Sequence, residues 1–370
     1  MGKNRNEKGG VVMKEFSCRT KLVMGQGAVE ALQNWNFQRL MIISDPFFVK
    51  NGWAERIGRY SKCHEIFDQV VPDPSVELVA KGTGAVQAFR PDGMVALGGG
   101  SAMDCAKAMC YFSGLDIPLI AIPTTSGSGS EVTDFAVLTH NGIKYPLVDE
   151  KLKPRMAILE EDLLTSMPVS LIADSGFDVI AHALEAWVGK NSNPMTDALA
   201  FDSFRIACNQ LPLSAEGDLS ARMAVHCAAS MAGLAFTHAG LGLCHALSHS
   251  LGGLLHLPHG RLNAILLPAV ITCNGEFAGA KYACLSRLMG LGGGSDMMAI
   301  RNLKNALIRL RGQLNLPANL EQAGVHWDQW RGKTPQIIAS ALADPCCSTN
   351  PGAVTEEMVH LVLKEIAGRG

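Results

Sequence analysis

The feature that most constrains the fold is a change of pattern along the chain. Up to residue 160, short apolar runs alternate with stretches whose apolar residues recur at helical spacing. Such alternation of strand and helix predicts a parallel sheet with helical crossovers. The expected strands are 40–44, 64–68, 94–98, 118–123 and 156–160, and the helical stretches between them include 74–89 and 101–112.

From Pro168 onward, strand-like runs nearly cease and helical patterns rich in Ala, Leu and Met follow. The expected helices are 168–188, 194–211, 218–239, 242–255, 277–290 and 297–312. A chain of 370 residues favours two domains over one. We therefore expect a polar leader at 1–14, a candidate for disorder, then an α/β domain at 15–167 and an all-α domain at 168–370.

Charge and composition exclude several classes of partner. Lys and Arg number 32 against 34 Asp and Glu, so no basic face for nucleic acid is expected. The sequence contains no run of eighteen uninterrupted apolar residues, so no membrane span is expected, and the N-terminus lacks the apolar core of a signal peptide. The eleven cysteines form no C-x-x-C pair, which indicates reduced thiols and a cytoplasmic location.

A glycine-rich turn follows the expected strand 94–98. The stretch GGGSAMDCAK (98–107) opens a helix, and its three glycines allow a sharp turn and a close approach to a bound group. Exposed amides at a helix N-terminus suit a phosphate. The alternative is a tight strand-to-helix turn without a ligand, and the stretch is not the G-x-G-x-x-G fingerprint of the standard Rossmann fold.

Two further features lie at strand ends. The loop PTTSGSGSEVTD (123–134) follows the next strand, and its hydroxyls and glycines suit the same cleft, although Ser/Gly loops are often only loops. Asp45 ends the first expected strand, where a carboxylate accepts hydrogen bonds from an adenosine ribose and favours NAD over NADP. An Asx turn before Pro46 explains Asp45 equally well.

Histidines are concentrated in GLCHALSHSLGGLLHLPHG (242–260), which holds four of the eleven in the chain. His245 and His249 are four residues apart, and Asp178 and His182 repeat that spacing within SGFDVIAHALEAW. Residues four apart share one helix face. Polar groups in such apolar stretches are costly unless they are paired or bind a metal.

One carboxylate and three imidazoles would suit Fe(II) or Zn(II). The pattern H-A-L-S-H lacks the Glu of H-E-x-x-H, which excludes a metalloprotease site. On an unbroken helix His256 would share a face with His245, and His259 would lie slightly round from it. Gly252, Gly253 and Pro258 make continuity uncertain, so spacing leaves both histidines open as the last ligand.

Several ordered motifs together resemble the iron-containing (group III) alcohol dehydrogenases. The resemblance runs from about residue 15 to the C-terminus, and within the family the chain is most similar to the propanol and ethanol dehydrogenases associated with bacterial microcompartments. The motifs are GGGSAMDCAK, IPTTSGSGSEVT, GFDVIAHALEAWV, GLGLCHALSH and LPHGRLNAILLP.

The resemblance implies a dehydroquinate synthase-like architecture, with a Rossmann-like nucleotide-binding domain, a helical domain and the active site between them. It implies metal ligation by Asp178, His182, His245 and His259, and it places His249 near the metal to relay a proton or orient substrate. The implied cofactor-binding residues are Asp45, Gly98, Gly99, Gly100, Ser101, Asp104, Thr124, Thr125, Ser128 and Lys144.

Two positions depart from the family pattern. Ser128 stands where Thr is usual, which keeps the hydroxyl but loosens a cofactor contact. Arg261 follows His259 and Gly260 where a small apolar residue is common, so it changes the expected surroundings of His259.

The function expected from the resemblance is reversible, NAD(H)-linked interconversion of a short-chain aldehyde, propanal or acetaldehyde, and its primary alcohol, with Fe(II), or alternatively Zn(II), as the metal. We expect a homodimer or larger homo-oligomer in the cytoplasm, with a microcompartment and its shell or cargo proteins as the alternative setting. The rival functions are a dehydroquinate-synthase-like lyase, a glycerol-dehydrogenase-like enzyme and a non-catalytic microcompartment-associated subunit. The lyase needs basic residues for a phosphate substrate, and 230–260 contains no Lys or Arg.

Overall fold

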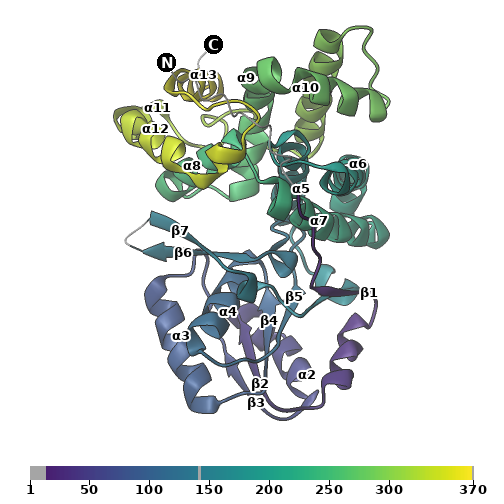
Figure 1. The fold of residues 1–370 in the computed structure, drawn as a ribbon, viewed down its shortest axis with the longest axis vertical. Helices are drawn as coiled ribbons and strands as arrows, with labels where there is room; N and C mark the ends of the chain where they lie inside the picture. The colour runs from purple at the N-terminus through teal and green to yellow at the C-terminus, as the bar shows by residue number, and fades with distance from the viewer. Residues whose placement is uncertain (1–13, 141–142, 369–370) are drawn as a thin grey trace, which may run out of the picture.

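The computed structural model describes residues 14–140 and 143–368, and nearly all of the expected polar leader lies outside this range. Figure 1 shows a sheet region built from the first half of the chain and a helical region built from the second half. This arrangement confirms the predicted fold class.

Six parallel strands form the sheet, in the order β1-β8-β5-β4-β2-β3. The five predicted strands are all present, whereas the edge strand β1 was not predicted because its five residues show no clear apolar alternation. The strands are β1 (Lys21–Gly25), β2 (Phe37–Ser44), β3 (Ser61–Phe67), β4 (Gly93–Gly98), β5 (Leu119–Pro123) and β8 (Met156–Glu160).

Helices cover both faces of this sheet (Figure 1). Side chains alternate across β2, so Met41 and Ile43 pack under α3 and α4 while Leu40 and Ile42 pack under η1 and α2. Burial on both faces explains why the inner strands β4, β5 and β8 read as continuous apolar runs. The covering elements are η1 (Ala28–Trp35), α1 (Pro46–Lys50), α2 (Trp53–Gly58), α3 (Val76–Phe89) and α4 (Gly100–Ser113).

A hairpin that the sequence did not predict lies between the sheet and the helical region (Figure 1). Its antiparallel strands are β6 (Phe135–His140) and β7 (Ile143–Val148). Short one-turn helices lie before the hairpin, after it and after β8. They are η2 (Ser130–Val132), η3 (Glu150–Leu152) and η4 (Glu161–Leu164).

The helical region begins at Val169, within the stretch where the pattern of the sequence changes. Side chains cap the starts of several of these helices. At the start of α6, for example, the Asn193 side chain accepts a hydrogen bond from the Thr196 amide, and the Thr196 hydroxyl accepts one from the Asn193 amide. The elements are α5 (Val169–Val188), α6 (Pro194–Glu216), α7 (Leu219–Ala239), α8 (Leu243–Leu255), α9 (His259–Leu288), α10 (Asp296–Gln313), α11 (Trp327–Trp330), η5 (Arg331–Lys333), α12 (Thr334–Ala343), η6 (Pro345–Thr349) and α13 (Glu356–Ile366).

The expectation of a helix over 277–290 was wrong in extent, because α9 starts at His259 and continues past the internal Pro268. Proline lacks the amide that would bond the Ala264 carbonyl one turn earlier. The Arg311 guanidinium donates to that carbonyl oxygen at 3.2 Å instead. A charged donor from α10 therefore satisfies the group that the proline leaves without a partner.

Two helices, Leu219–Ala239 and His259–Leu288, are long and apolar enough to cross a membrane by length and composition alone. In each of them 67% of the most apolar window is buried against the rest of the protein. Core helices of water-soluble proteins meet the same criterion, so this is weak evidence for a membrane span.

Candidate active site between the sheet and the helices

Three helices carry the four predicted metal ligands. Asp178 and His182 lie one turn apart on α5, His245 lies in the first turn of α8, and His259 is the first residue of α9. The spacing of four on α5 places both its side chains on one face, as the sequence predicted.

The distances within this group fit a shared metal ion. Asp178 Oδ1 lies 3.9 Å from the Nε2 atom of His182, 3.7 Å from that of His245 and 3.6 Å from that of His259. These separations are too long for hydrogen bonds. Ligand atoms about 2.0–2.2 Å from one tetrahedral ion lie roughly 3.3–3.6 Å apart. Ligand atoms of Asp178, His245 and His259 all lie within 4.8 Å of one another, and His182 is the histidine farthest from the Asp178 oxygen. A carboxylate and imidazoles as donors fit Fe(II) or Zn(II).

The structure separates the two histidines that spacing left open. Helix α8 ends at Leu255, and His256 follows in the left-handed conformation, with φ of 53°. The chain then turns, and Pro258 caps the start of α9. As a result His259 faces Asp178, whereas His256 is exposed to solvent outside the cluster.

Burial favours the metal-binding form of His182. His182 stacks between the rings of Phe236 and His245, with both centroids 4.5 Å away, and burial lowers its pKa to about 4. A neutral imidazole is the form that binds a metal. Burial alone would raise the pKa of Asp178, but the facing histidines outweigh it and hold that pKa well below its usual value.

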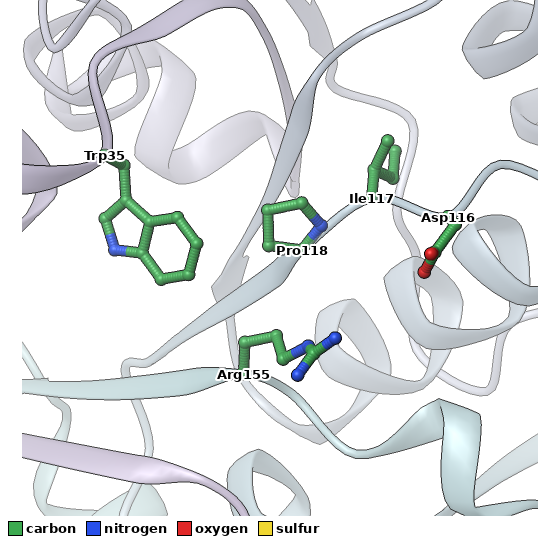
Figure 2. Close-up of a pocket in the computed structure, with 5 residues that line it drawn as sticks. All are labelled: Trp35, Asp116, Ile117, Pro118 and Arg155. Atoms are coloured by element: carbon green, nitrogen blue, oxygen red, sulfur yellow. The ribbon is translucent and has the colours of Figure 1, made fainter.

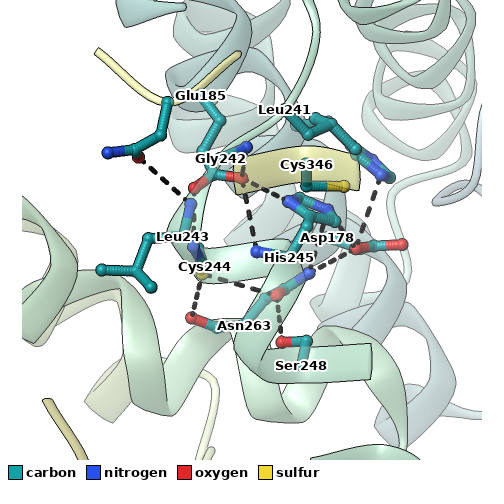
Figure 3. A network of polar contacts seen from close by, with 12 residues as sticks. Asp178, Glu185, Leu241, Gly242, Leu243, Cys244, His245, Ser248, Asn263 and Cys346 are labelled. Carbon is teal, nitrogen blue, oxygen red and sulfur yellow. Dashed lines mark hydrogen bonds and ion pairs between the residues drawn. The ribbon is translucent and has the colours of Figure 1, made fainter. Parts of the chain in front are cut away.

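Two residues that the sequence reasoning missed hold these ligands in place (Figure 3). Glu185 Oε2 lies 2.6 Å from Nδ1 of His245, and the same carboxylate accepts from the Gly242 and Cys244 amides. Asn263 donates to Asp178 Oδ1 at 2.7 Å. Asp178, His182 and Glu185 follow one helix face at spacings of four and three, and that pattern was a usable signal for Glu185.

Arg261, the departure noted in the sequence, joins the two helices that carry the metal ligands. Its Nε and Nη2 atoms lie 3.1 and 2.9 Å from the two carboxylate oxygens of Asp174 on α5. Such a bidentate pair fixes both position and orientation. Arg261 therefore ties the start of α9 to α5 beside His259.

His249 lies at the edge of the cluster. Its ring stacks on that of His259 with centroids 5.2 Å apart, and its Nδ1 atom lies 2.8 Å from Asp344 Oδ2. His249 thus lies beside the predicted metal ligands, and its role in proton relay stays a prediction. Asp344 was not singled out from the sequence.

The glycine turn lies between β4 and α4, where Asp45, Thr125 and Ser128 surround it. A Cβ atom at Gly99 would lie 3.1 Å from Thr125 Oγ1, and one at Gly100 would lie 3.2 Å from the Ser128 Cβ. The carboxyl ends of the adjacent strands β2, β4 and β5 thus bring these predicted residues together.

The two carboxylate oxygens of Asp45 fit the two interpretations that the sequence left open, a turn before Pro46 and a contact with a ribose. Its Oδ1 accepts from the Phe47 amide at 2.9 Å and caps α1. Its Oδ2 faces the glycine turn, 3.4 Å from where a Gly98 Cβ would lie. One oxygen is therefore structural, and the other faces the expected nucleotide cleft.

The remaining predicted cofactor residues make protein contacts around the turn. Ser101 accepts from the Asp73 amide at 3.3 Å, and Lys144 pairs with the Asp73 carboxylate at 2.7 Å. The Thr124 amide donates to the Gly98 carbonyl at 2.9 Å. Asp104 accepts from Ser130 and from the Val137 amide, and its burial raises the pKa of that carboxyl.

A buried lysine that the sequence analysis did not single out holds the loop after β5 in place. Lys107 is buried and donates to Ser130, Thr133 and the Phe135 carbonyl, each at 2.9 Å. Burial lowers its pKa to about 8. Lys107 thus connects α4 to the loop after β5.

That loop also contacts the helix that carries the metal ligands. A Cβ atom at Gly127 would lie 2.9 Å from Ser175 Cβ on α5, so the two backbones approach closely. The same loop contributes Thr125 and Ser128 to the glycine turn. A nucleotide on the turn would therefore lie beside the metal ligands.

Figure 2 shows the residues that line a separate cavity of about 290 Å³. Pro118 and Arg155 in its lining precede β5 and β8, so it opens at the amino ends of these strands. The candidate site lies at the carboxyl ends, and this cavity is therefore separate from it.

Comparison with known proteins identifies one enzyme family along nearly the whole chain. Residues 19–161 match the family model described as iron-containing alcohol dehydrogenase, and 172–367 match the C-terminal model of the Fe-containing alcohol dehydrogenase family. The chain is 38% identical to the 1-propanol dehydrogenase PduQ of Citrobacter freundii, covering 96% of this chain and 100% of that protein.

Other relatives show the same similarity. The NADPH-dependent butanol dehydrogenase of Clostridium saccharobutylicum is 33% identical, over 95% of this chain and 97% of that protein. The structure of an iron-containing alcohol dehydrogenase from Thermococcus thioreducens superposes with a TM-score of 0.89 at 31% identity, over 96% of this chain and 100% of that one.

Proposed function

Because the chain belongs to the iron-containing alcohol dehydrogenase family, we propose that it interconverts propanal or acetaldehyde and the corresponding primary alcohol. Family membership confirms the predicted enzyme class, an NAD(H)-linked alcohol dehydrogenase, with iron as the family metal. The choice of a short-chain aldehyde is supported by the names of the two relatives above, a 1-propanol and a butanol dehydrogenase.

The observation that carries the proposal is the loop 123–134, which contacts both the glycine turn and α5. This contact favours a cleft in which the residues that would hold a nicotinamide nucleotide lie beside the residues that would hold a metal. Holding two reactants in one orientation supplies much of the rate of such a transfer. The nicotinamide supplies the hydride, and the protein supplies position and exclusion of water.

In this proposal Asp178, His182, His245 and His259 hold the metal. The metal, when bound, acts as a Lewis acid on the substrate oxygen. Glu185 and Asn263 orient these ligands, and His249 exchanges a proton with the substrate oxygen. The nucleotide is held by the glycine turn and its neighbours, and the Oδ2 of Asp45 that faces this turn favours NAD over NADP.

The setting of the enzyme is part of the proposal. We take residues 15–167 as the nucleotide-binding domain and 168–370 as the metal-binding domain, assembled as a homodimer or larger oligomer. A cytoplasmic location, with a bacterial microcompartment as the alternative, rests on the family resemblance. Light scattering on the purified protein and fractionation of microcompartments would test the assembly and the location.

The proposed activity is tested by purifying the protein without oxygen, adding Fe(II), and following NADH absorbance after propanal is added. We expect rapid NADH oxidation that a chelator abolishes. Bound metal and bound NADH without turnover of propanal or acetaldehyde would contradict the substrate assignment.

His259→Ala should lose tight metal binding and activity, since His259 lies 3.6 Å from Asp178. His256→Ala is the matched control, because His256 is three residues away and exposed. Full metal content and activity in His259→Ala would contradict the ligand assignment.

A further inference from the structure

A second histidine–carboxylate pair lies beside the metal ligands. His249 is one turn after His245 on α8, and Asp344 lies between α12 and η6. His249 Nδ1 and Asp344 Oδ2 are 2.8 Å apart, with side chains 29% and 14% exposed. The two residues are 95 positions apart in the sequence, so only the packing of α8 against the C-terminal helices brings them together.

The geometry identifies this pair as a hydrogen bond and not as a second metal site. Ligand atoms of His249, Asp344 and Cys346 all lie within 4.8 Å of one another. However, 2.8 Å is a direct hydrogen-bond distance. The carboxylate-to-imidazole separations of 3.6–3.9 Å at the metal cluster differ clearly from it.

Asp344 is held rigidly on both of its oxygens. Oδ1 accepts from the Cys346 amide at 2.8 Å and caps η6, while Oδ2 faces His249. Burial alone would raise the pKa of Asp344, but the contact with His249 outweighs it and lowers that pKa to about 2. An ionised carboxylate only accepts hydrogen bonds, so Nδ1 of His249 must be the donor.

The other ring nitrogen of His249 is available for chemistry. Across residues 14–140 and 143–368, Nε2 of His249 has no hydrogen-bond partner of its own. Its ring is nearly parallel to that of His259, at an interplanar angle of 16°. A proton on Nδ1 leaves a lone pair on Nε2 of the neutral ring.

We propose that Asp344 is a positioning residue that keeps a proton on Nδ1 of His249 and thereby presents Nε2 to the substrate oxygen. This inference rests on the proposed function. In alcohol oxidation, Nε2 takes the hydroxyl proton as the C–H bond breaks and the hydride reduces NAD⁺. In aldehyde reduction, hydride from NADH forms the C–H bond and protonated Nε2 returns a proton to oxygen. Solvent then takes this proton from the partly exposed His249 after oxidation, or returns one to it after reduction.

Asp344→Asn tests the pair through activity. Asn caps a helix about as well as Asp, but its amide NH₂ can donate to Nδ1 and so favours the opposite tautomer. We expect kcat with propanal to fall about 10- to 100-fold, within the range of general acid–base catalysis. KM for propanal and NADH should change less than about threefold, and the solvent deuterium isotope effect on kcat should rise.

Two comparisons separate positioning from a structural effect. In a His249→Ala background, Asp344→Asn should cause no further loss, because the group that it positions is absent. Asp218→Asn is the matched control, since Asp218 also caps a helix, at the exposed start of α7, without a histidine partner. Its kcat should be unchanged. Independent, multiplicative losses from His249→Ala and Asp344→Asn would overturn the proposal.

A measurement without turnover tests the tautomer directly. In Zn(II)-loaded, ¹⁵N-histidine-labelled protein, His249, identified by its absence in His249→Gln, should show a protonated Nδ1 and a bare Nε2. Asp344→Asn should reverse this, and Asp344→Ser, which caps but cannot reach His249, should remove the preference. An unchanged tautomer in both variants would overturn the proposal. If the tautomer changes as expected while wild-type protein reduces no aldehyde, the positioning role is supported and the proposed function has failed.

Discussion

At the scale of single residues, His245 lies between two carboxylates. Asp178 is 3.7 Å from its Nε2, and Glu185 is 2.6 Å from its Nδ1. Burial acts to lower the pKa of His245, but hydrogen bonds and charges from both carboxylates outweigh it and raise that pKa to about 9. The bond at Nδ1 fixes the ring so that Nε2 faces the metal position.

Glu185→Gln should weaken metal binding about 10- to 100-fold, since outer carboxylates orient the ligand and raise its basicity. Competition with a chromophoric chelator measures this change. Glu216→Gln is the control, because Glu216 is exposed at the end of α6. Equal metal affinity in Glu185→Gln and wild type, with folding unchanged by circular dichroism, would contradict the role assigned to Glu185.

At the scale of elements, the group of predicted metal ligands depends on close contact between α5 and α9. A Cβ atom at Gly260 would overlap the Asp174 carbonyl oxygen, which is backbone and cannot move independently of α5. The Arg261–Asp174 pair lies at the same contact. The absence of a side chain at Gly260 therefore sets how near His259 comes to Asp178.

Gly260→Ala should displace the start of α9 and reduce bound metal to less than about a tenth of one ion per chain. Elemental analysis of the purified protein measures the content. Gly275→Ala lies in the same helix with open space around its Cβ and should retain wild-type metal. Stoichiometric metal in Gly260→Ala would show that this contact does not position His259.

A substitution in the glycine turn tests where the nucleotide binds. Gly98 has φ of 150°, and a Cβ atom there would lie 2.7 Å from the Ala102 Cβ, so an alanine would be strained. Gly98→Ala should raise the Kd for NADH at least about tenfold without changing metal content, as read by NADH fluorescence. Gly84→Ala, in open space on α3, is the control. Unchanged NADH affinity in Gly98→Ala would place the nucleotide elsewhere.

At the scale of the whole molecule, the predicted metal would join α5, α8 and α9, while the nucleotide turn belongs to the sheet region. A ligand that binds only the folded state stabilises the elements that it joins. Chelation should therefore speed amide exchange in 243–262 and leave β4 and β5 unchanged. NADH should slow exchange in 98–104 and 123–134. Hydrogen-exchange mass spectrometry measures both, and re-addition of Zn(II) should restore protection. An equal effect of chelation on the sheet would contradict this division.

Local patterns made the sheet and the ligand pair on α5 predictable. Continuous apolar runs indicated the buried strands, since burial on both faces needs no alternation. Spacing of four placed Asp178 and His182 on one face. Local patterns failed where distant groups compensate, as at Pro268, whose missing amide is replaced by Arg311. The edge strand β1 and the β6–β7 hairpin also escaped detection because short strands carry little periodicity.

The sequence by itself therefore determined the fold class, the glycine turn and the set of metal-ligating residue types. Spacing left His256 and His259 open and the family resemblance implied His259, and the tertiary structure supplies the physical reason, because the left-handed turn at His256 redirects the chain. Only the tertiary structure joined Glu185 to His245, and Asp344 to His249. The physical reason is that helical and strand spacing act within one element, whereas contacts between elements depend on how several helices pack at once.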